Sequence, residues 1–146
     1  MRAVLQRVLG AEVQADGRSV GRIDLGLLVY VGVAQADTPE QAAKLAEKVA
    51  NLRIFDDEGG KLNKSVRDVR GGVLAVPNFT LLADARKGRR PAFVNAAAGD
   101  HASSLFQAFL AALRNECCHV ASGAFGAAMT INSTADGPVN IVLDID

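Results

Sequence analysis

The sequence lacks an excess of charge of either sign, because its 16 Lys and Arg residues are balanced by 16 Asp and Glu residues. A protein without net charge has no global field that attracts nucleic acid, so any such contact must come from a local basic patch. Cysteine is also scarce. The only two cysteines, Cys117 and Cys118, are adjacent, a spacing that suits neither an ordinary disulfide nor a zinc site. We interpret them as structural thiols in a reducing compartment.

Long hydrophobic runs are absent as well. No stretch of about 18 apolar residues occurs, and the amino terminus has neither a long apolar core nor a cleavage site. These absences predict a soluble, cytoplasmic protein with no membrane partner. The length of 146 residues predicts a single domain, 1–146, built around one core.

Few residues are available for metal or nucleophile chemistry. The only histidines, His101 and His119, do not have the spacing of a metal-ligand set. A Cys-His or Ser-His pair could still form in space, but the sequence contains no signature for one. It contains neither a phosphate-binding P-loop nor a dinucleotide fingerprint. The residues alone therefore predict no metal site.

Strand patterns dominate the first part of the chain. Segments 3–8 and 11–15 have strand composition, and Asp16-Gly17 predicts a tight hairpin, because this turn needs positive φ at both central positions. Residues 25–33 are nearly all apolar, which is typical of a central strand covered on both faces. Two closing strands are expected at 123–131 and 139–143, separated by residues 132–138.

Two segments have helical periodicity. Thr38, Pro39 and Gln41 predict an N-cap, a first-turn proline and a capping box, followed by a buried stripe of Ala42, Leu45, Val49 and Leu52. Residues 56–60 are expected to end this helix, and 61–70 have no clear pattern. Asp100 is a candidate N-cap for the second helix, whose apolar positions are Ala102, Leu105, Phe106, Phe109, Leu110 and Leu113. This order of strands and helices predicts an α+β fold.

The candidate site lies in residues 71–83, where an apolar run is interrupted by Pro77-Asn78-Phe79-Thr80. Because Pro77 cannot donate to a β-ladder, we expect regular pairing to fail there and to leave the following backbone amides free. Free amides beside a hydroxyl group can polarise a carbonyl. The alternative interpretation is a strand that simply ends in a turn.

A basic cluster follows the candidate site. Residues 84–91 contain four of the 16 basic residues, Arg86, Lys87, Arg89 and Arg90. Such a cluster can be ordinary solvated surface, but beside a candidate site it becomes a candidate phosphate contact. If the chain binds an RNA, we expect these four residues to contact its backbone.

Five parts of the sequence, 6–8, 73–83, 90–93, 123–129 and 136–139, together resemble the D-aminoacyl-tRNA deacylase family. The similarity spans the whole chain. The family's Ser-Gln-Phe-Thr motif is represented by Pro77-Asn78-Phe79-Thr80, with proline in place of serine and asparagine in place of glutamine. Its Asn-x-Gly-Pro-Val-Thr motif ends at Asn140, which replaces the threonine, while Gly137 and Pro138 match.

The resemblance implies a homodimer of α+β domains, with mixed and antiparallel sheets in a barrel-like arrangement and two main helices. It implies hydrolysis of D-aminoacyl-tRNA, and of glycyl-tRNA mischarged on tRNA-Ala, with no metal or organic cofactor. Asn78 and Phe79 then contact the substrate. A cis Gly137-Pro138 motif enters the partner subunit's pocket and rejects L-aminoacyl groups by exclusion, and Arg7 orients that motif. An arginine near a strand can instead be a surface charge.

Three alternatives stay open. Thr80 could be a nucleophile, although no base is evident beside it, or it could position the ester while the 2′-hydroxyl of the terminal adenosine assists, which we favour. An animal relative of the family also carries proline at the first motif position and has a laxer chiral preference, so a deacylase acting on other mischarged tRNA is the second alternative. The third is a non-enzymatic RNA-binding module that uses the basic loop.

Overall fold

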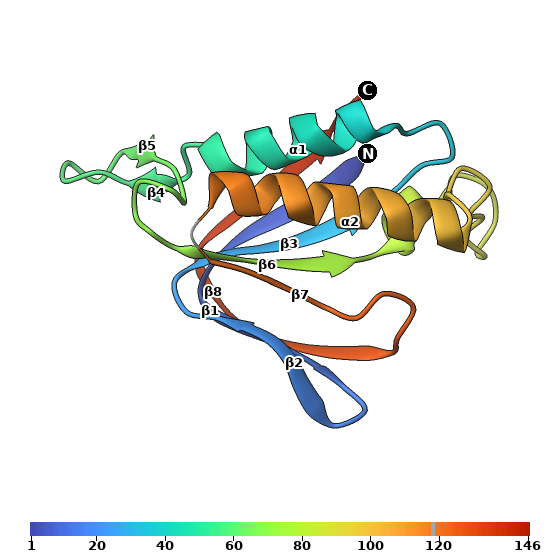
Figure 1. The fold of residues 1–146 in the computed structure, drawn as a ribbon, viewed down its shortest axis with the longest axis horizontal. Helices are drawn as coiled ribbons and strands as arrows, with labels where there is room; N and C mark the ends of the chain where they lie inside the picture. Colours follow the sequence, from blue (N-terminus) through green and yellow to red (C-terminus); the bar gives the residue numbers. More distant parts are fainter. Residues whose placement is uncertain (118) are drawn as a thin grey trace.

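The computed structural model describes residues 1–117 and 119–146, in which two helices lie side by side on one face of a curved sheet (Figure 1). The elements in chain order are β1 (Arg2–Ala15), β2 (Arg18–Ile23), β3 (Gly26–Gly32), α1 (Pro39–Asn51), β4 (Phe55–Asp56), β5 (Leu62–Lys64), β6 (Gly72–Pro77), the 3-10 helix η1 (Phe79–Leu82), α2 (Gly99–Glu116), β7 (His119–Ser122) and β8 (Met129–Asp144). The predicted α+β class and the two main helices are confirmed.

The principal sheet is mixed, with the strand order β2-β1-β3-β6-β7 and with β8 paired to β1. Strand β1 is antiparallel to β2, β3 and β8, whereas β3 with β6 and β6 with β7 are parallel pairs joined through α1 and α2. The sheet curls until β2 lies beside β7, since a Cβ atom on Gly21 would be 2.7 Å from the carbonyl oxygen of Ser122. The sheet is therefore nearly closed and barrel-like, as expected.

Both faces of the central strand β3 are buried, as its sequence predicts. Leu27 and Val29 pack on one face with the helices, in a core that includes Phe106 and Phe109. Leu28 packs on the other face, inside the curl of the sheet, in a second cluster that includes Val8, Val13, Leu74 and Val76. Successive side chains of a strand point to opposite faces, so an unbroken apolar run serves both clusters.

Helix α1 begins as predicted, because the backbone amide of Thr38 donates to Oε1 of Gln41 at 2.6 Å. Ala42, Leu45 and Val49 are buried, and Leu52 packs at the edge of the core. The expectation that residues 56–60 end the helix is wrong. The helix already ends at Asn51, and 56–60 lie within the small β4–β5 hairpin.

Helix α2 begins two residues earlier than predicted. Its N-cap is Ala98, and Asp100 lies inside the first turn, where a carboxylate interacts favourably with the helix dipole. All six apolar positions predicted for this helix are buried. Cys117 follows the helix and is buried, which agrees with a structural thiol, whereas Cys118 lies outside the described residues.

Two strand predictions are corrected. Segments 3–8 and 11–15 form one strand, β1, which turns into β2 through Asp16 and Gly17 at φ 52° and 72°, as the hairpin signal predicts. The closing strands are displaced: β7 precedes 123–128, and β8 runs without a break through 132–138. Pairing with β1 along its length holds β8 extended, and register shifts absorb the irregular part. In the part of the chain that the structure describes, no helix is long and apolar enough to cross a membrane.

Candidate functional site

The polar tetrad lies at the carboxyl end of β6, but the predicted loss of pairing at Pro77 does not occur. Pro77 stays in register with Val31 of β3, and the amide of Asn78 donates to the carbonyl oxygen of Val31 at 2.8 Å. In a parallel strand, the backbone groups of successive residues point alternately to the two neighbouring strands. The Asn78 amide points to β3, so the position of the missing N–H of Pro77 faces β7. Pairing with β7 already ends at Ala75, and the proline therefore costs no ladder bond there.

Asn78 caps the short helix η1 and organises the tetrad. Its Oδ1 atom accepts a hydrogen bond from the amide of Thr80 at 3.2 Å and another from the Thr80 hydroxyl. The amide of Phe79 donates none of the hydrogen bonds found among the described residues. Of the amides predicted to be free, only that of Phe79 remains available to polarise a ligand's carbonyl group.

A small apolar cavity of about 100 Å³ opens beside the tetrad. Its walls come from β3, α2 and the loop before β8, through residues such as Val31, Val33, Phe106 and Phe125. Asn78 is the one polar side chain among its lining residues. The cavity can therefore accept a small apolar group while a polar neighbour is held at Asn78.

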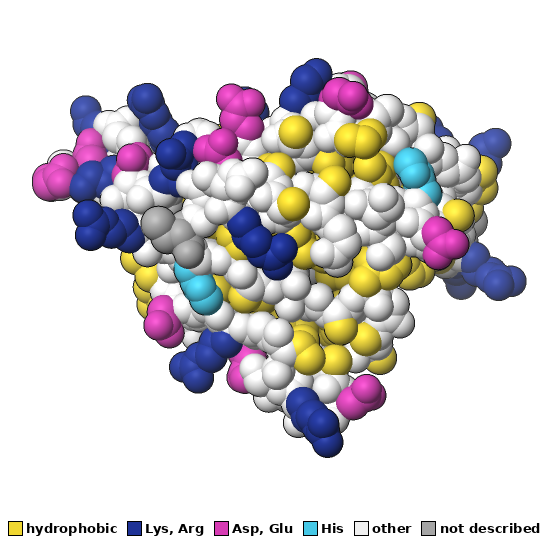
Figure 2. Space-filling model, viewed as in Figure 1, with side chains coloured by type: hydrophobic (Ala, Val, Ile, Leu, Met, Phe, Trp, Pro, Cys, Tyr) yellow, Lys and Arg dark blue, Asp and Glu magenta, His cyan; other side chains and the backbone are white. Residues whose placement is uncertain are grey.

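Phe79 projects outward beside this cavity and is 58% exposed. Its ring packs edge-to-face against Phe93, with ring centroids 5.1 Å apart. Figure 2 shows exposed hydrophobic atoms in the zone between the helical layer and the lower part of the sheet. An exposed aromatic ring held by a second ring is a suitable platform for stacking a nucleobase.

The basic loop, residues 84–92, lies directly between η1 and Phe93 in the sequence. Asp84 and Ala92 close it with two backbone hydrogen bonds of 2.7 and 2.9 Å, so it forms a projection between η1 and Phe93. Arg86 pairs with Asp84 at 2.6 Å, and this contact lowers the pKa of Asp84 and raises that of Arg86. The other three basic residues of the loop, Lys87, Arg89 and Arg90, are exposed, which leaves them accessible to phosphate groups.

Gly137 and Pro138 lie in β8, and neither lines the cavity beside Asn78. Their peptide bond is cis, as expected from the resemblance. Gly137 has φ 123°, and a Cβ atom there would be 2.8 Å from the amide nitrogen of Val139. Only glycine fits this backbone without strain. Within one chain, therefore, the structure does not bring this motif to the tetrad.

Arg7 connects this glycine-proline turn to the body of the protein. It is only 7% exposed, so it is not the surface charge of the alternative interpretation. Its Nε atom lies 3.1 Å from a carboxylate oxygen of Asp136 and also donates to the Asp136 backbone carbonyl at 3.4 Å. Its Nη1 atom donates to the carbonyl of Ile54 at 3.0 Å. Arg7 thus holds the residue that precedes Gly137.

The histidines contact backbone carbonyls away from the tetrad. His101 Nε2 lies 3.1 Å from the carbonyl oxygen of Asp37, and His119 Nε2 lies 3.2 Å from that of Arg22. Among the described residues, no hydrogen bond joins either histidine to Thr80. Among residues 1–117 and 119–146, no group of three His, Cys, Asp or Glu side chains could hold a metal ion.

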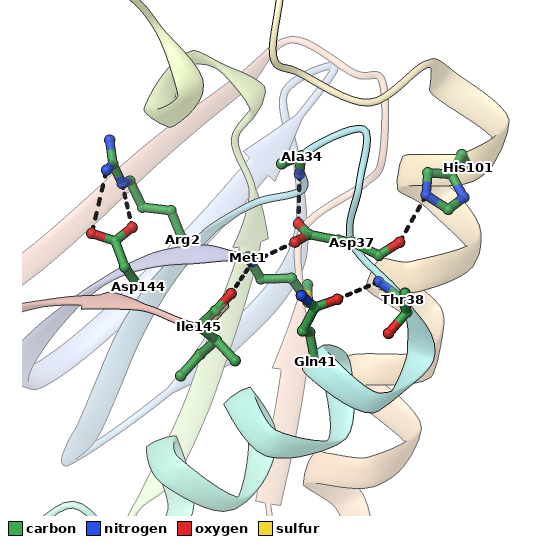
Figure 3. A network of polar contacts seen from close by, with 9 residues as sticks. All are labelled: Met1, Arg2, Ala34, Asp37, Thr38, Gln41, His101, Asp144 and Ile145. Carbon is green, nitrogen blue, oxygen red and sulfur yellow. Dashed lines mark hydrogen bonds and ion pairs between the residues drawn. The ribbon is translucent and has the colours of Figure 1, made fainter.

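One buried polar group was not predicted from the sequence. Asp37 accepts a hydrogen bond from the Met1 ammonium group at 2.7 Å and another from the amide of Ala34 at 2.6 Å (Figure 3). The Met1 ammonium also donates to the Ile145 carbonyl at 2.7 Å. An acidic residue just before the predicted N-cap was the only signal available, and it does not reveal a partner 36 positions away.

Comparisons with known proteins cover nearly the entire chain. Residues 4–144 match the model of a family described as D-Tyr-tRNA(Tyr) deacylase. The chain is 53% identical to the D-aminoacyl-tRNA deacylase of Thermus aquaticus, over 99% of this chain and 95% of that protein. It is 52% identical to that of Deinococcus deserti, over 99% of each. The solved structure of a protein named c-Myc DNA Unwinding Element Binding Protein superposes with a TM-score of 0.94 at 36% identity, covering 100% of this chain and 99% of that one.

Proposed function

Because the chain belongs to the D-Tyr-tRNA(Tyr) deacylase family, we propose that it hydrolyses the ester bond between a D-amino acid and the terminal adenosine of a tRNA. The observation that carries this proposal is the 53% identity to a D-aminoacyl-tRNA deacylase across 99% of the chain. Such an enzyme is a hydrolase that releases the free amino acid and tRNA during translation quality control. Since its substrate is used by ribosomes, we assign it to the cytoplasm.

The tetrad supplies what ester hydrolysis needs from a protein. Water adds to the ester carbonyl carbon, and the electron pair of the C=O bond moves onto oxygen. The tetrahedral intermediate then breaks its bond to the 3′ oxygen of adenosine, which takes the proton lost by the water. The amide of Phe79 is available to stabilise the oxyanion, and the exposed Phe79 ring is available to stack the terminal adenine.

Thr80 positions the ester in this proposal and does not attack it. The hydroxyl proton of Thr80 is directed to the Asn78 side-chain oxygen, which is an amide oxygen and too weak a base to activate a nucleophile. The neighbouring 2′-hydroxyl of the terminal adenosine is a better placed assistant, because it belongs to the substrate itself. Asn78 and Thr80 then hold the short turn that presents the Phe79 amide.

Chirality is read, in our proposal, by Gly137 and Pro138 of a second copy of the chain. Their carbonyl groups form a wall that admits hydrogen on one side of the substrate's α-carbon and excludes a side chain. Glycine has no side chain on either side, so glycyl-tRNA mischarged on tRNA-Ala also fits. Two observations support a homodimer: the motif does not line its own chain's cavity, and Pro138 and Asn140 are exposed on β8, whose one pairing partner among the described residues is β1.

Mixing two inactive variants tests the cross-subunit arrangement. Asn78→Ala damages the tetrad and Gly137→Ala damages the wall, so a mixed dimer keeps one site with both parts intact. Random mixing should restore roughly a quarter of the parental activity, because half of the dimers are mixed and each has one of two sites intact. If both parts of a site came from one chain, mixing would restore nothing.

The basic loop is proposed to hold the tRNA backbone through Arg86, Lys87, Arg89 and Arg90. Three of them are exposed without a carboxylate partner among the described residues, and the loop ends next to Phe93, which packs on Phe79. Phosphate contacts at this position would orient the acceptor end toward the tetrad. In Figure 2, Lys and Arg side chains project from the end of the molecule where Figure 1 shows this loop.

A second candidate is a nucleic-acid-binding module without hydrolase activity. The observation that favours it is the solved relative at 36% identity, whose name describes a DNA-binding protein. Incubation of the purified protein with D-tyrosyl-tRNA and L-tyrosyl-tRNA separates the candidates. We expect release of D-tyrosine alone. A module would leave both esters at the background rate, and a deacylase of relaxed chirality would attack both.

A further inference from the structure

Asp37 is a buried carboxylate that lies outside the motifs described above. We propose that its ion pair with the Met1 ammonium is a positioning device for the Phe79–Phe93 side of the site. The part of this inference that concerns activity rests on the proposed function. The structural part, that the ion pair orders the segment below Phe93, stands on the contacts alone.

Both carboxylate oxygens of Asp37 accept hydrogen bonds, and both members of the ion pair, Met1 and Asp37, are buried. The side chains of Met1 and Asp37 are 0% and 6% exposed, and their charged atoms are 2.7 Å apart. The second oxygen accepts the Ala34 amide at 2.6 Å (Figure 3). A buried charge is costly unless it is paired, so the Met1 ammonium and the Asp37 carboxylate each hold the other in place. The segment that carries Ala34 is fixed with them.

This fixed segment is the platform for residues 93–97. The amide of Gln35 donates to the Asn95 carbonyl at 3.0 Å, and the amide of Ala97 donates to the Val33 carbonyl at 2.9 Å. The Gln35 side chain adds a bond of 2.6 Å to the carbonyl of Val94. Three hydrogen bonds therefore join the 93–97 segment to residues 33–35, the segment that Asp37 orders.

Residues 33–35 and the 93–97 segment contact the candidate site through two side chains, one from each segment. Phe93 precedes the tied residues and packs edge-to-face on Phe79, with centroids 5.1 Å apart. Val33, at the start of the platform, lines the cavity beside Asn78. Loss of the ion pair should loosen Ala34 and Gln35 first, then the 93–97 segment, and finally the orientation of the Phe79 ring. Asp37 is thus a positioning residue that acts through Phe93.

The test compares the parent with Asp37→Asn and with the full-length protein acetylated at the Met1 amine. Asparagine can still accept one hydrogen bond, so the fold should survive the loss of charge. We expect hydrogen exchange at the amides of Gln35 and Ala97 to quicken by about tenfold or more, while the amides of the central strand β3 keep their parental rates. Acetylation should produce the same local change and add little to Asp37→Asn, because both remove one interaction.

The activity readout separates positioning from a general loss of fold. If Phe79 binds the terminal base, KM for D-tyrosyl-tRNA should rise severalfold with kcat within about twofold of the parent. Glu58→Gln is the control, since it removes the exposed ion pair of Glu58 with Lys64, which shares no contact with Met1 or Asp37 among the described residues, and it should change neither readout. Unchanged exchange at Gln35 and Ala97, or equal acceleration in every element, would overturn the proposal. If the parent fails to cleave any aminoacyl-tRNA, the proposed function fails while the exchange result still decides the structural part.

Discussion

Replacing Arg7 with methionine tests whether this side chain joins β1 to the glycine-proline turn. Methionine keeps much of the apolar stem but removes the guanidinium group, which donates to Ile54 at 3.0 Å and pairs with Asp136 at 3.1 Å. Each hydrogen bond to a charged group contributes about 1.5–3 kcal/mol. Asp136 is 38% exposed and can regain water, so we expect a net loss of about 2–4 kcal/mol in the free energy of unfolding.

Arg2→Met is the matched control, because it lies on the same strand and removes the same chemical group. The side chains of Arg2 and Asp144 are 42% and 51% exposed, so their ion pair should contribute at most about 1 kcal/mol. Urea unfolding followed by circular dichroism measures both variants under the same conditions. A difference of about 2 kcal/mol corresponds to roughly 4–8 °C in Tm for a chain of this size.

The activity of Arg7→Met should fall further than its stability explains. At a temperature where the variant is fully folded, a loosened Asp136–Gly137 turn should lower D-tyrosyl-tRNA hydrolysis by about tenfold or more. If Arg7→Met is no less stable than Arg2→Met, the buried contacts of Arg7 make no net contribution to the free energy of unfolding, which contradicts this prediction. Parental activity in a destabilised but folded variant would show that Arg7 supports the fold and not the turn.

Three further outcomes are expected. Thr80→Ala should keep measurable deacylation, because the lost hydroxyl bond to Asn78 contributes about 1 kcal/mol, and complete loss of activity with a trapped aminoacyl-enzyme in the parent would contradict this. Replacing Arg89 and Arg90 with alanine should weaken tRNA binding and flatten its dependence on salt, and a parental salt slope would mean that the loop is solvated surface. The hydrogen bond from Arg2 lowers the pKa of Asp144, so its small contribution to stability is present above about pH 4 and is lost as the pH falls through the lowered value. Urea midpoints of Asp144→Asn should therefore differ from the parent at pH 7 and converge in acid, and a gap that persists in acid would exclude this ion pair as its cause.

Features that depend on neighbouring residues could be predicted from the sequence. The bond between Thr38 and Gln41, the Asp16-Gly17 hairpin and the buried face of α2 all arise within a few positions of the chain. Each has a local cause, such as an orphan amide at a helix start or the need for positive φ. The predictions of the two helices and of the central strand β3 were correct for this reason.

Features that depend on distant pairing could not be predicted in this way. Residues 132–138 look like a turn because they contain glycine and proline, yet their pairing with β1 keeps them in β8. Pro77 is tolerated because the pairing of β6 with β7 has already ended at Ala75, which only the sheet order and register reveal. The ion pair between Met1 and Asp37 joins residues whose sequence contexts have nothing in common.

The candidate site also contains features that the sequence predicts locally and features that it does not. The tetrad at 77–80 was found from its interruption of an apolar run, and the structure adds the contact between Asn78 and Thr80. The roles of Arg7, Gly137 and Pro138 came from resemblance, because a buried arginine looks like any other arginine in a strand sequence. The structure adds the contact of Arg7 with Asp136, from which the role proposed for Arg7 is argued.

In our proposal, this chain removes D-amino acids from tRNA and spares the L form. The most direct measurement is the rate of tyrosine release from one tRNA preparation charged in parallel with D-tyrosine and L-tyrosine, with enzyme below the substrate concentration. We expect multiple turnovers on D-tyrosyl-tRNA, background hydrolysis of L-tyrosyl-tRNA, and loss of the D-specific rate in Asn78→Ala. Equal rates on the two esters, or no release above background from either, would contradict the claim.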